Sequence, residues 1–425
     1  MRNIWYSIYN VIFIPLLVAL VRIGSLFNKK IAQGIKDRKK LFENLIISLL
    51  DIDRTKKMIW FHSASMGEFE QAKPIIKKLK AEKDVNIIVT FFSPSGYRNS
   101  LNYPYADVIS YLPLDSSVLT KRFIKYVRPN LVIFMRYDIW PNLIWSLNKK
   151  SIPTMIVDAT MRSDSNRKLP GIKNFHKSLY QSFTKILTVS DQNTSSFKEF
   201  GLPDNKVVTV GDTRYDRVYE KSLKAKDKKL FDEKLIVDKK VFVFGSSWLA
   251  DEDVILPAIT KVIKYDPNVV MILAPHEPTT INLDRLENYF SNKLETIRFS
   301  YMNYYNNENV ILVDSIGILL TLYYYADLAY VGGSFKQGIH NVLEPAVYGI
   351  PVIYGPKHQN SLEALKLSEL GSGIVIHNKR EAYRQLRTLL SDDTKRNQLG
   401  NISKNFVEQN IGASQKILKE ILEII

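Results

Sequence analysis

Short apolar runs alternate with amphipathic segments over most of the chain. Runs that end at glycine or polar residues are typical of buried parallel strands, and the segments between them are typical of helices. This alternation predicts an α/β fold with parallel sheets. The predicted strands are 58–62, 85–92, 131–135, 153–158, 186–189 and 207–210, then 241–248, 269–274, 310–313, 326–331 and 350–354.

The runs fall into two sets, which is expected because 425 residues exceed one ordinary core. A lysine-rich stretch without strong strand signals, 220–240, separates them and predicts a linker. We therefore expect an N-terminal segment at 1–28, one domain at 29–219 and a second at 241–425. The last part of the second domain, 379–425, has a helical pattern.

Residues 3–21 carry no charge and are rich in Ile, Leu and Val. Their number is close to the roughly 20 that a spanning helix needs, although Pro15 and several polar residues weaken the pattern. The basic residues that follow place the remaining chain on the cytoplasmic side. A membrane anchor, a helix lying in the interface and a buried amphipathic helix are the alternatives. The basic residues are Arg22, Lys29, Lys30, Lys36, Arg38, Lys39 and Lys40.

Composition narrows the possible chemistry. The chain has no cysteine, which excludes disulfides, thiolate metal sites and cysteine nucleophiles. Its net charge of +16 predicts an anionic partner: nucleic acid, an acidic membrane surface or a phosphorylated substrate. The lysines are spread along the chain and no nucleic-acid signature is present, so nucleic acid is not expected as a partner.

Residues 330–356 predict a strand, a glycine loop, a helix and a further strand. Asn341 suits the start of the helix, with Glu344 three residues on as in a capping box, and Gly349 suits its end. A helix N-terminus favours a phosphate, and a carboxylate one turn later can accept hydrogen bonds from a ribose diol. The alternative is that the glycines and Asn341 only form a turn.

Five further segments join strands to loops or helices: HSASMGEFE (62–70), RYDIWPN (136–142), GDTRYD (211–216), GSSWLADE (245–252) and APHEP (274–278). Together with GGSFKQGIHNVLEPAVYGIPVIYGP (332–356), they give the chain a resemblance to 3-deoxy-D-manno-octulosonic acid (Kdo) transferase, a lipid A glycosyltransferase family. The resemblance extends over nearly the whole chain.

The resemblance implies a GT-B fold, in which two Rossmann-like domains face each other across a cleft, with an N-terminal membrane-associated helix. It implies CMP-Kdo as the donor and a lipid A precursor as the acceptor, at the cytoplasmic face of the inner membrane. It also implies inversion at the anomeric carbon without a bound metal or other cofactor.

The resemblance places the family's catalytic base on Glu68. An inverting transfer needs such a base to take the proton of the attacking hydroxyl. The alternative is a helix-entry carboxylate that the helix dipole favours. Asp138 matches a second carboxylate of the family that is normally Glu and reaches one methylene further. Arg136 is expected to pair with a substrate acid or with Asp138.

Arg214 matches a position that usually holds Lys and stabilises the departing phosphate. A guanidinium can bind a phosphate through two parallel hydrogen bonds, so the exchange is chemically sensible. The alternative is an ion pair with Asp212 or Asp216.

The resemblance places donor binding in the second domain. His276 replaces a common Arg there, and Ile318 stands where Glu is frequent, so the backbone would make that contact. His62 and His340 are more commonly packing or capping residues than catalysts. The predicted donor-binding residues are Ser246, Ser247, Pro275, His276, Gly317, Ile318, Leu319, Gly333, His340, Asn341, Leu343 and Glu344.

Two other functions are compatible with these features. One is a GT-B enzyme that uses a UDP-sugar, either a transferase or an epimerase, because such folds share the glycine loop and the helix-borne Glu. The other is a non-catalytic basic protein that binds a membrane surface through its charge.

Overall fold

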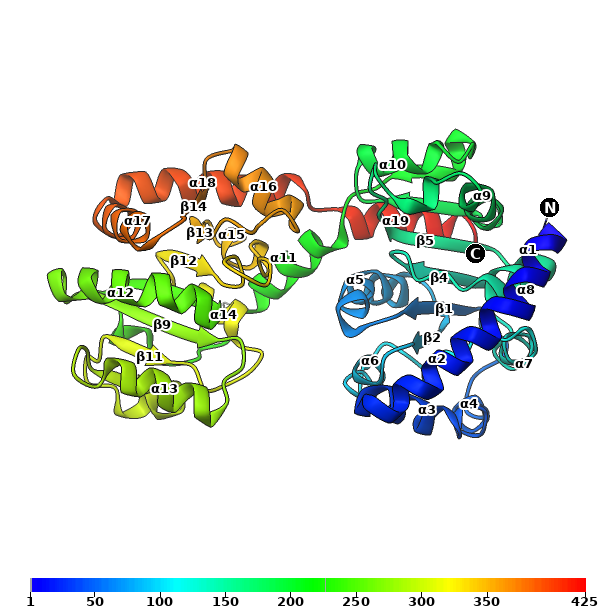
Figure 1. The fold of residues 1–425 in the computed structure, drawn as a ribbon, viewed down its shortest axis with the longest axis horizontal. Helices are drawn as coiled ribbons and strands as arrows, with labels where there is room; N and C mark the ends of the chain where they lie inside the picture. Colours follow the sequence, from blue (N-terminus) through cyan, green and yellow to red (C-terminus); the bar gives the residue numbers. More distant parts are fainter. Residues whose placement is uncertain (1, 226) are drawn as a thin grey trace. The chain divides into compact units, whose positions relative to one another are not determined.

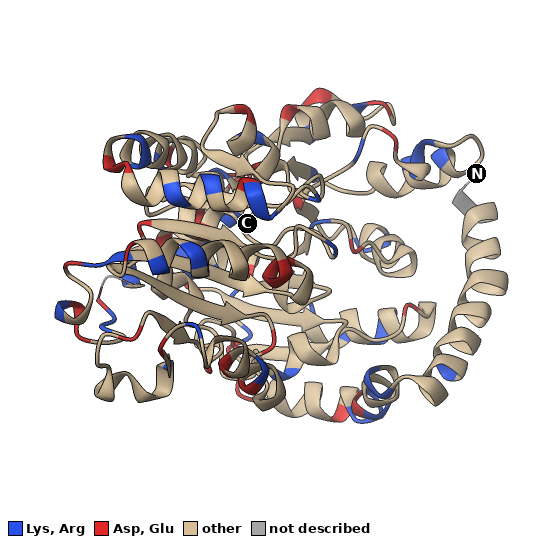
Figure 2. Ribbon diagram, turned by 60° about the vertical axis from the view of Figure 1, so that its left-hand side comes forward, with Lys and Arg blue, Asp and Glu red and all other residues tan. Residues whose placement is uncertain are grey.

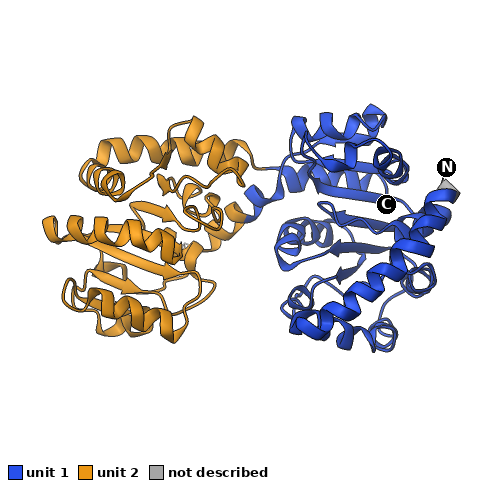
Figure 3. Cartoon of the chain, in the orientation of Figure 1, with its two compact units in different colours: residues 1–217, 412–425 blue, residues 218–411 orange. Residues whose placement is uncertain are grey.

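The computed structural model describes residues 2–225 and 227–425. The chain forms two compact units (Figure 3). Unit 1 comprises Met1–Arg217 together with Gly412–Ile425, and unit 2 comprises Val218–Ile411. Helix α11 (Thr213–Ala225) contains the boundary between them.

Unit 1 is built on a parallel sheet in the order β3-β2-β1-β4-β5-β6-β7 (Figure 1). In β1, Met58 and Trp60 belong to one hydrophobic core and Ile59 and Phe61 to another, so helices cover both faces. The strands are β1 (Met58–Ser63), β2 (Asn86–Phe91), β3 (Val108–Tyr111), β4 (Leu131–Met135), β5 (Thr154–Ala159), β6 (Lys185–Thr188) and β7 (Val207–Thr209).

The longest helix after a strand in unit 1 is α5 (Met66–Glu82), which begins at the cap residue Ser65. Its apolar side, which includes Phe69, Ile75 and Leu79, is buried against the sheet. The other helices are α3 (Lys29–Arg38), α4 (Leu41–Ser48), α6 (Pro94–Arg98), α7 (Ser117–Val127), α8 (Pro141–Lys149), α9 (Ile172–Gln181), α10 (Asp191–Lys198) and α19 (Ala413–Leu422), with 3₁₀ turns η2 (Asn166–Lys168) and η3 (Asp204–Lys206).

The N-terminal apolar segment is one continuous helical run: α1 (Arg2–Ile8), the π-helix η1 (Tyr9–Phe13) and α2 (Ile14–Phe27). The wide π turn lies directly before Pro15, which lacks an N–H and would clash with a carbonyl one turn earlier in a regular helix. Among the described residues, one helix, Ile4–Phe27, is long and apolar enough to cross a membrane.

The first half of this helix is attached to unit 1 by polar contacts. The hydroxyl of Tyr9 donates to buried Asp115 (2.9 Å), which also accepts the Asn142 and Leu143 N–H groups at the start of α8. Asn10 exchanges side-chain hydrogen bonds of 2.9 Å with Asn142. Large apolar side chains are nevertheless exposed along the whole run, from Val11 (73%) to Leu26 (79%) and Phe27 (85%).

Unit 2 repeats the architecture with a parallel sheet in the order β10-β11-β9-β8-β12-β13-β14. Its strands are β8 (Lys240–Ser247), β9 (Val269–Pro275), β10 (Thr296–Arg298), β11 (Val310–Leu312), β12 (Leu328–Val331), β13 (Val352–Tyr354) and β14 (Gly373–Val375). Its helices are η4 (Glu233–Leu235), α12 (Leu249–Tyr265), α13 (Thr280–Phe290), η5 (Phe299–Tyr304), α14 (Leu319–Tyr323), α15 (Leu343–Ala346), α16 (Leu362–Glu369), α17 (Lys379–Ser391) and α18 (Asp393–Gln409).

The predicted α/β fold with two Rossmann-like parallel sheets is confirmed, and each predicted strand is present to within a few residues. Three strands were not predicted: β3, β10 and β14. The end of the chain also differs from the prediction, because 412–425 lies in unit 1 instead of the second domain. Gly412 N donates to Asp216 at the start of this segment (3.0 Å), and α19, the red helix of unit 1 in Figure 1, packs on α5.

A close backbone approach holds the loops after β8 and β12 together. Gly332 N donates to Gly245 O (2.9 Å), and a Cβ on Gly332 would lie 2.0 Å from the carbonyl oxygen of Ser246. Since backbone atoms cannot turn away as a flexible side chain can, only glycine fits at 332.

Gly332→Ala is therefore expected to lower the free energy of unfolding by about 1–3 kcal/mol, the usual cost of overpacking. Urea unfolding followed by circular dichroism measures it. Gly67→Ala is the matched control, because a Cβ there would meet nothing closer than Ser65 Oγ at 3.9 Å on helix α5. An unchanged midpoint for Gly332→Ala would show that the two loops do not require this approach.

Candidate active site

The predicted site residues lie at the carboxyl ends of the parallel strands in both units. In each sheet the chain first runs from the first strand, β1 or β8, towards one edge. It then crosses back to the other side of that strand, where β4 or β12 lies. Open α/β sheets bind ligands at such switch points. Glu68 and Asp138 follow β1 and β4 at the switch of unit 1. At the switch of unit 2, Ser247 ends β8 and Gly333 follows β12.

Glu68 is buried in the first turn of α5, with 8% of its surface exposed. The backbone N–H of Ala64 donates to its carboxylate (2.5 Å), and Ser65 Oγ accepts the N–H of Glu68 itself. Burial raises the pKa of Glu68, and the negative charge of Asp138 adds to this, whereas the Ala64 hydrogen bond opposes it. The carboxyl group is therefore a stronger proton acceptor than an exposed glutamate.

Asp138 lies near Glu68 and is held from two sides. His62 Nε2 is 2.8 Å from its carboxylate and Trp140 Nε1 donates to it (3.0 Å). Burial opposes ionisation of Asp138, but the hydrogen bonds and the charge of His62 outweigh burial, so the pKa of Asp138 is lowered. The buried ring of His62 bridges Asp138 to Thr90 Oγ1 (2.9 Å) and is a positioning residue for this carboxylate.

Arg136 and Asp158 form a second group at the same edge of the sheet. Both have positive φ angles, 62° and 52°, at the ends of β4 and β5. Asp158 is fully buried, accepts from Thr213, and has a raised pKa because of burial and the nearby charge of Asp212. Within the described part of the chain, Arg136 Nε is buried without a hydrogen-bond partner, so its predicted pairing with Asp138 is not observed.

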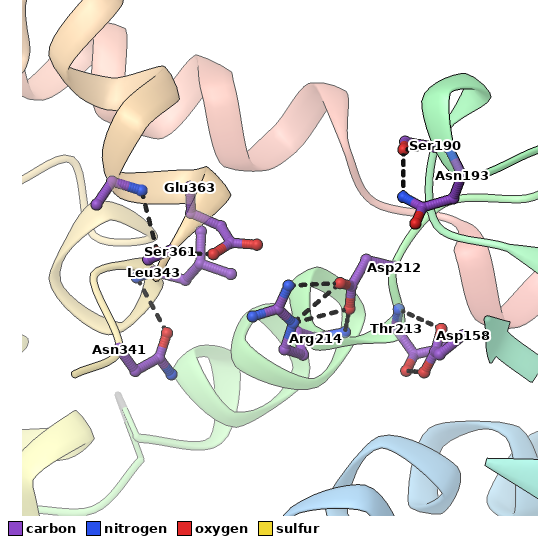
Figure 4. Close-up of polar contacts among 11 residues, drawn as sticks. Asp158, Ser190, Asn193, Asp212, Thr213, Arg214, Asn341, Leu343, Ser361 and Glu363 are labelled. Carbon is purple, nitrogen blue, oxygen red and sulfur yellow. Dashed lines mark hydrogen bonds and ion pairs between the residues drawn. The ribbon is translucent and has the colours of Figure 1, made fainter. Parts of the chain in front are cut away.

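Arg214 lies at the start of α11 and pairs with Asp212, as Figure 4 shows. Its Nε and Nη2 donate to the Asp212 carboxylate at 2.9 and 2.7 Å, and its backbone N–H donates to the same group. The ion pair that the sequence offered as an alternative to phosphate binding is therefore present. Asp216 instead accepts from Gly412 and Ser414 at the start of α19.

In unit 2, Trp248, His276 and His340 form a layered aromatic cluster. The rings of Trp248 and His276 stack with centroids 4.3 Å apart, and His276 lies 4.7 Å from His340. Trp248 Nε1 donates to His340 Nε2 (2.9 Å). Burial lowers the pKa of His340, as does the nearby His276, so this ring stays neutral and accepts the hydrogen bond.

The two glycine loops of unit 2 are organised by buried carboxylates. Asp251 accepts from Gly333 N (2.8 Å) and the Tyr330 hydroxyl (2.9 Å). Glu252 accepts from Ser247 Oγ (2.8 Å) and pairs with Arg285. The adjacent Ser246, like Gly333, has a positive φ, which turns the chain sharply after β8.

Asn341 shapes the loop before α15, although the helix is shorter than predicted and its cap residue is Val342. Asn341 Oδ1 accepts from Leu343 N (3.2 Å), and its amide donates to Glu344 (3.1 Å), so the expected contact between these two residues is present (Figure 4 shows the first). Helix α15 ends close to Gly349, whose φ is 75°.

The other predicted donor residues lie at neighbouring strand ends. Pro275 ends β9, and His276 N donates to Ser247 O (3.0 Å). Gly317 is exposed with a φ of 84° and precedes the short helix α14. Ile318 and Leu319 pack partly against the core of unit 2, so their backbone is better placed than their side chains to contact a ligand.

Comparison with known proteins agrees with this geometry. Residues 34–217 match the family model described as 3-deoxy-D-manno-octulosonic-acid transferase (kdotransferase). The 3-deoxy-D-manno-octulosonic acid transferase of Aquifex aeolicus is 30% identical over 341 residues, covering 79% of this chain and 87% of that protein. The chain belongs to the Kdo transferase family. The Haemophilus influenzae Kdo transferase is 28% identical and covers 98% of this chain and 97% of its own length.

Solved structures support the fold. The UDP-GlcNAc 2-epimerase from Neisseria meningitidis bound to UDP-GlcNAc matches with a TM-score of 0.61 over 86% of this chain and 100% of that chain. At 14% identity this likeness shows a GT-B-like arrangement of two Rossmann-like sheets and nothing of the substrate. The present chain is thus a glycosyltransferase by family and GT-B-like by fold.

Several residues of these clusters were not predicted. Trp248 and Asp251 lie within the segment GSSWLADE (245–252), but nothing in the sequence distinguished them from ordinary residues at the start of a helix. Asp158 ends a predicted strand, and its burial could be expected from that position alone. That Arg136 Nε is buried without a hydrogen-bond partner in the described part of the chain could not be inferred from the adjacent sequence.

The raised pKa of Glu68 predicts a pH-dependent effect on stability. A carboxyl whose folded pKa is raised contributes most below its unfolded pKa, and that contribution is lost as the pH rises through the folded pKa. Glu68→Gln removes the charge but keeps an oxygen for the Ala64 N–H. We expect its melting temperature to exceed that of the native protein at pH 7 and the difference to shrink towards pH 4.

Calorimetry at several pH values measures this difference. Glu82→Gln is the control, since Glu82 is exposed at the other end of α5 and such a surface change normally stays within about 0.5 kcal/mol. A Glu68→Gln variant that is less stable than the native protein at pH 7 would show that the charged carboxylate is stabilising.

Proposed function

We propose that this protein transfers Kdo from CMP-Kdo to a lipid A precursor, with inversion at the anomeric carbon and with Glu68 as the general base. The observation that carries the proposal is the buried Glu68 carboxylate, held by the Ala64 N–H at the switch point of unit 1. Family membership and relatives named Kdo transferases support the choice of sugar.

In the proposed reaction, an acceptor hydroxyl loses its proton to Glu68 as its oxygen bonds to the anomeric carbon of Kdo. The bond from that carbon to the CMP phosphate breaks, and the phosphate takes the electron pair. A base works best when its pKa lies near the working pH, so burial of Glu68 favours this role. Ionised Asp138 then stabilises positive charge that develops on the reacting sugar.

Arg214 is proposed to stabilise the departing phosphate. Its guanidinium is held in one orientation by Asp212, which limits the freedom that must be lost when a phosphate binds. Arg136, whose Nε is buried without a partner among the described residues, is proposed to receive the carboxylate of Kdo. An unpaired guanidinium N–H in that position is costly unless an anion binds it.

We assign the donor nucleotide to the loops of unit 2. The turn at Ser246 and Ser247 and the loop at Gly333 lie side by side at the ends of β8 and β12, where Asp251 accepts the Gly333 N–H and fixes that loop. Trp248, His276 and His340 offer a flat aromatic surface for a base, and Asn341, Leu343 and Glu344 are proposed to bind the ribose and phosphate. Pro275, Gly317, Ile318 and Leu319 complete the proposed contacts.

The membrane contact is proposed to be the apolar helix α1–α2, with the catalytic units on the cytoplasmic side. Tyr9 and Asn10 attach the helix to unit 1, while Val11, Leu26 and Phe27 leave apolar surface exposed along its length. This pattern favours a helix lying in the interface over a separate spanning anchor. Figure 2 shows this helix almost without charge and basic residues on the helices that follow.

Glu68→Gln is expected to reduce kcat for Kdo transfer by about 10²–10⁴, the usual contribution of a general base. CMP affinity should stay within about twofold, because the variant loses a group that acts in the transition state. CMP release in steady state and calorimetric titration with CMP measure the two quantities. In the native protein, the acid limb of kcat/KM should lie above pH 4.5, the ordinary pKa of Glu.

The control is again Glu82→Gln, which should transfer Kdo at the native rate. If Glu68→Gln keeps the native kcat, Glu68 is only a helix-entry carboxylate.

Arg214→Ala is expected to lower kcat by about 10², the scale of removing one donor to developing negative charge. Arg214→Lys should recover part of the loss because a cation remains. Arg162→Ala is the control, since its ion pair with Asp164 is largely exposed. A native kcat in Arg214→Ala, with the native melting temperature, would show that Arg214 does not stabilise the departing phosphate.

A further inference from the structure

An open cavity of about 1030 Å³ lies beside helix α3 in unit 1. We call it the α3 cavity. This volume is at the upper end of the range of about 300–1000 Å³ for small-molecule sites. Its walls come from α3, the start of α4, the start of α6, the segment leading into α7 and the middle of α2. Apolar side chains that line it include Ile31, Ile35, Phe42, Pro94, Leu114 and Leu119.

Cations surround this apolar interior. Lys29, Lys30, Lys39 and Arg98 line the cavity, and its described lining includes no Asp or Glu. Across the residues that the structure describes, the three lysines have no carboxylate within ion-pair distance, whereas Arg98 pairs with Asp37. An apolar pocket with unpaired cations at its edge suits a ligand that has both a hydrocarbon part and an anionic group.

The wall of the α3 cavity is fixed by Arg38. Its guanidinium donates to Leu112 O (3.0 Å) and Phe92 O (2.6 Å), and it lies over the rings of Phe92 and Tyr111 at 4.8 and 4.7 Å. These contacts hold α3 against the carboxyl ends of β2 and β3. Arg38 therefore shapes the cavity and does not serve as a surface cation, although the sequence placed it in the basic run.

The cavity shares its wall with the candidate active site. Ser93, which lines it, donates its N–H to Ala64 O (2.9 Å), and Ala64 in turn donates to Glu68. Phe92, also in the lining, stacks on Trp140 with centroids 5.0 Å apart, and Trp140 donates to Asp138. One residue, Ala64 or Trp140, therefore connects each carboxylate to a residue that lines the α3 cavity.

We propose that the α3 cavity binds an acyl chain of the lipid acceptor, with Lys29, Lys30 and Lys39 contacting its phosphate. The inference rests on the proposed function, since it names how that acceptor is held. Val21 of the apolar helix α2 also lines the cavity, so a chain can enter it from the membrane in which that helix is proposed to lie. An acceptor held in this way brings its sugar hydroxyls to the loops around Glu68.

The first test fills the α3 cavity. Leu119→Trp adds bulk inside it, and Val118→Trp is the matched control, because Val118 is 71% exposed on the same helix and does not line the cavity. We expect Leu119→Trp to lower kcat/KM for a tetra-acylated precursor by about tenfold or more, the scale on which apolar pockets discriminate methylene groups. Transfer to the fully deacylated disaccharide should be unchanged, and Val118→Trp should affect neither acceptor.

An equal loss for both acceptors, or no loss for either in a folded Leu119→Trp variant, would overturn the proposal. The second test uses the native protein and does not depend on turnover. A lipid A precursor with a photoreactive group at the end of an acyl chain is expected to label peptides containing Phe42, Leu114 or Leu119. Labelling confined to residues of 4–27 other than Val21 would show that the chains contact only the apolar helix, outside the cavity.

The two tests separate this inference from the proposed function. If the native protein consumes no CMP-Kdo but the acyl probe labels the α3 cavity, the proposed function fails and the lipid site stands. If Kdo is transferred at the same efficiency to acylated and deacylated acceptors by both tryptophan variants, the function stands and the lipid site fails.

Discussion

In the proposed reaction, the chemistry of unit 1 depends on the hydrogen bond from the Ala64 N–H to the Glu68 carboxylate. A buried carboxylate without such a donor would take up a proton and lose its value as a base. Ser65 begins α5 and Ser93 donates to Ala64 O, so the backbone that carries the donor is itself fixed. Burial and this hydrogen bond oppose each other, which leaves the pKa of Glu68 raised.

Neighbouring loops connect the proposed catalytic carboxylates to the apolar helix. Asp115 accepts from Tyr9 in the apolar helix and from two N–H groups at the start of α8, which follows Asp138 and Trp140 directly. On the other side, Ser93 connects Ala64 to the α3 cavity. The loops of unit 1 that hold the two carboxylates therefore also contact the apolar helix and the lining of the cavity.

Sequence patterns predicted the strands in the interior of both sheets, because such strands are apolar on both faces and read as continuous runs. The strands β3, β10 and β14 were missed because they are short edge strands, and Thr296–Arg298 has no continuous apolar character. The return of 412–425 to unit 1 could not be predicted, since it depends on Asp216 and α5, which are distant in sequence.

The site shows the same division. Its residues follow predicted strands, so their place at the carboxyl edges could be inferred from the alternation of elements. The pairing of His62 with Asp138 and the stacking of Trp248 on His276 join separate strand ends, and local sequence contains no sign of such contacts. Arg38 illustrates the limit most clearly, because a residue in a basic run proves to be an internal support.

The most direct measurement is the mass of the lipid product after the purified full-length protein is incubated with CMP-Kdo and a tetra-acylated lipid A precursor. The account predicts an acceptor heavier by at least one Kdo residue, with CMP as the coproduct. An acceptor of unchanged mass, or CMP-Kdo converted only to CMP and free Kdo, would contradict it.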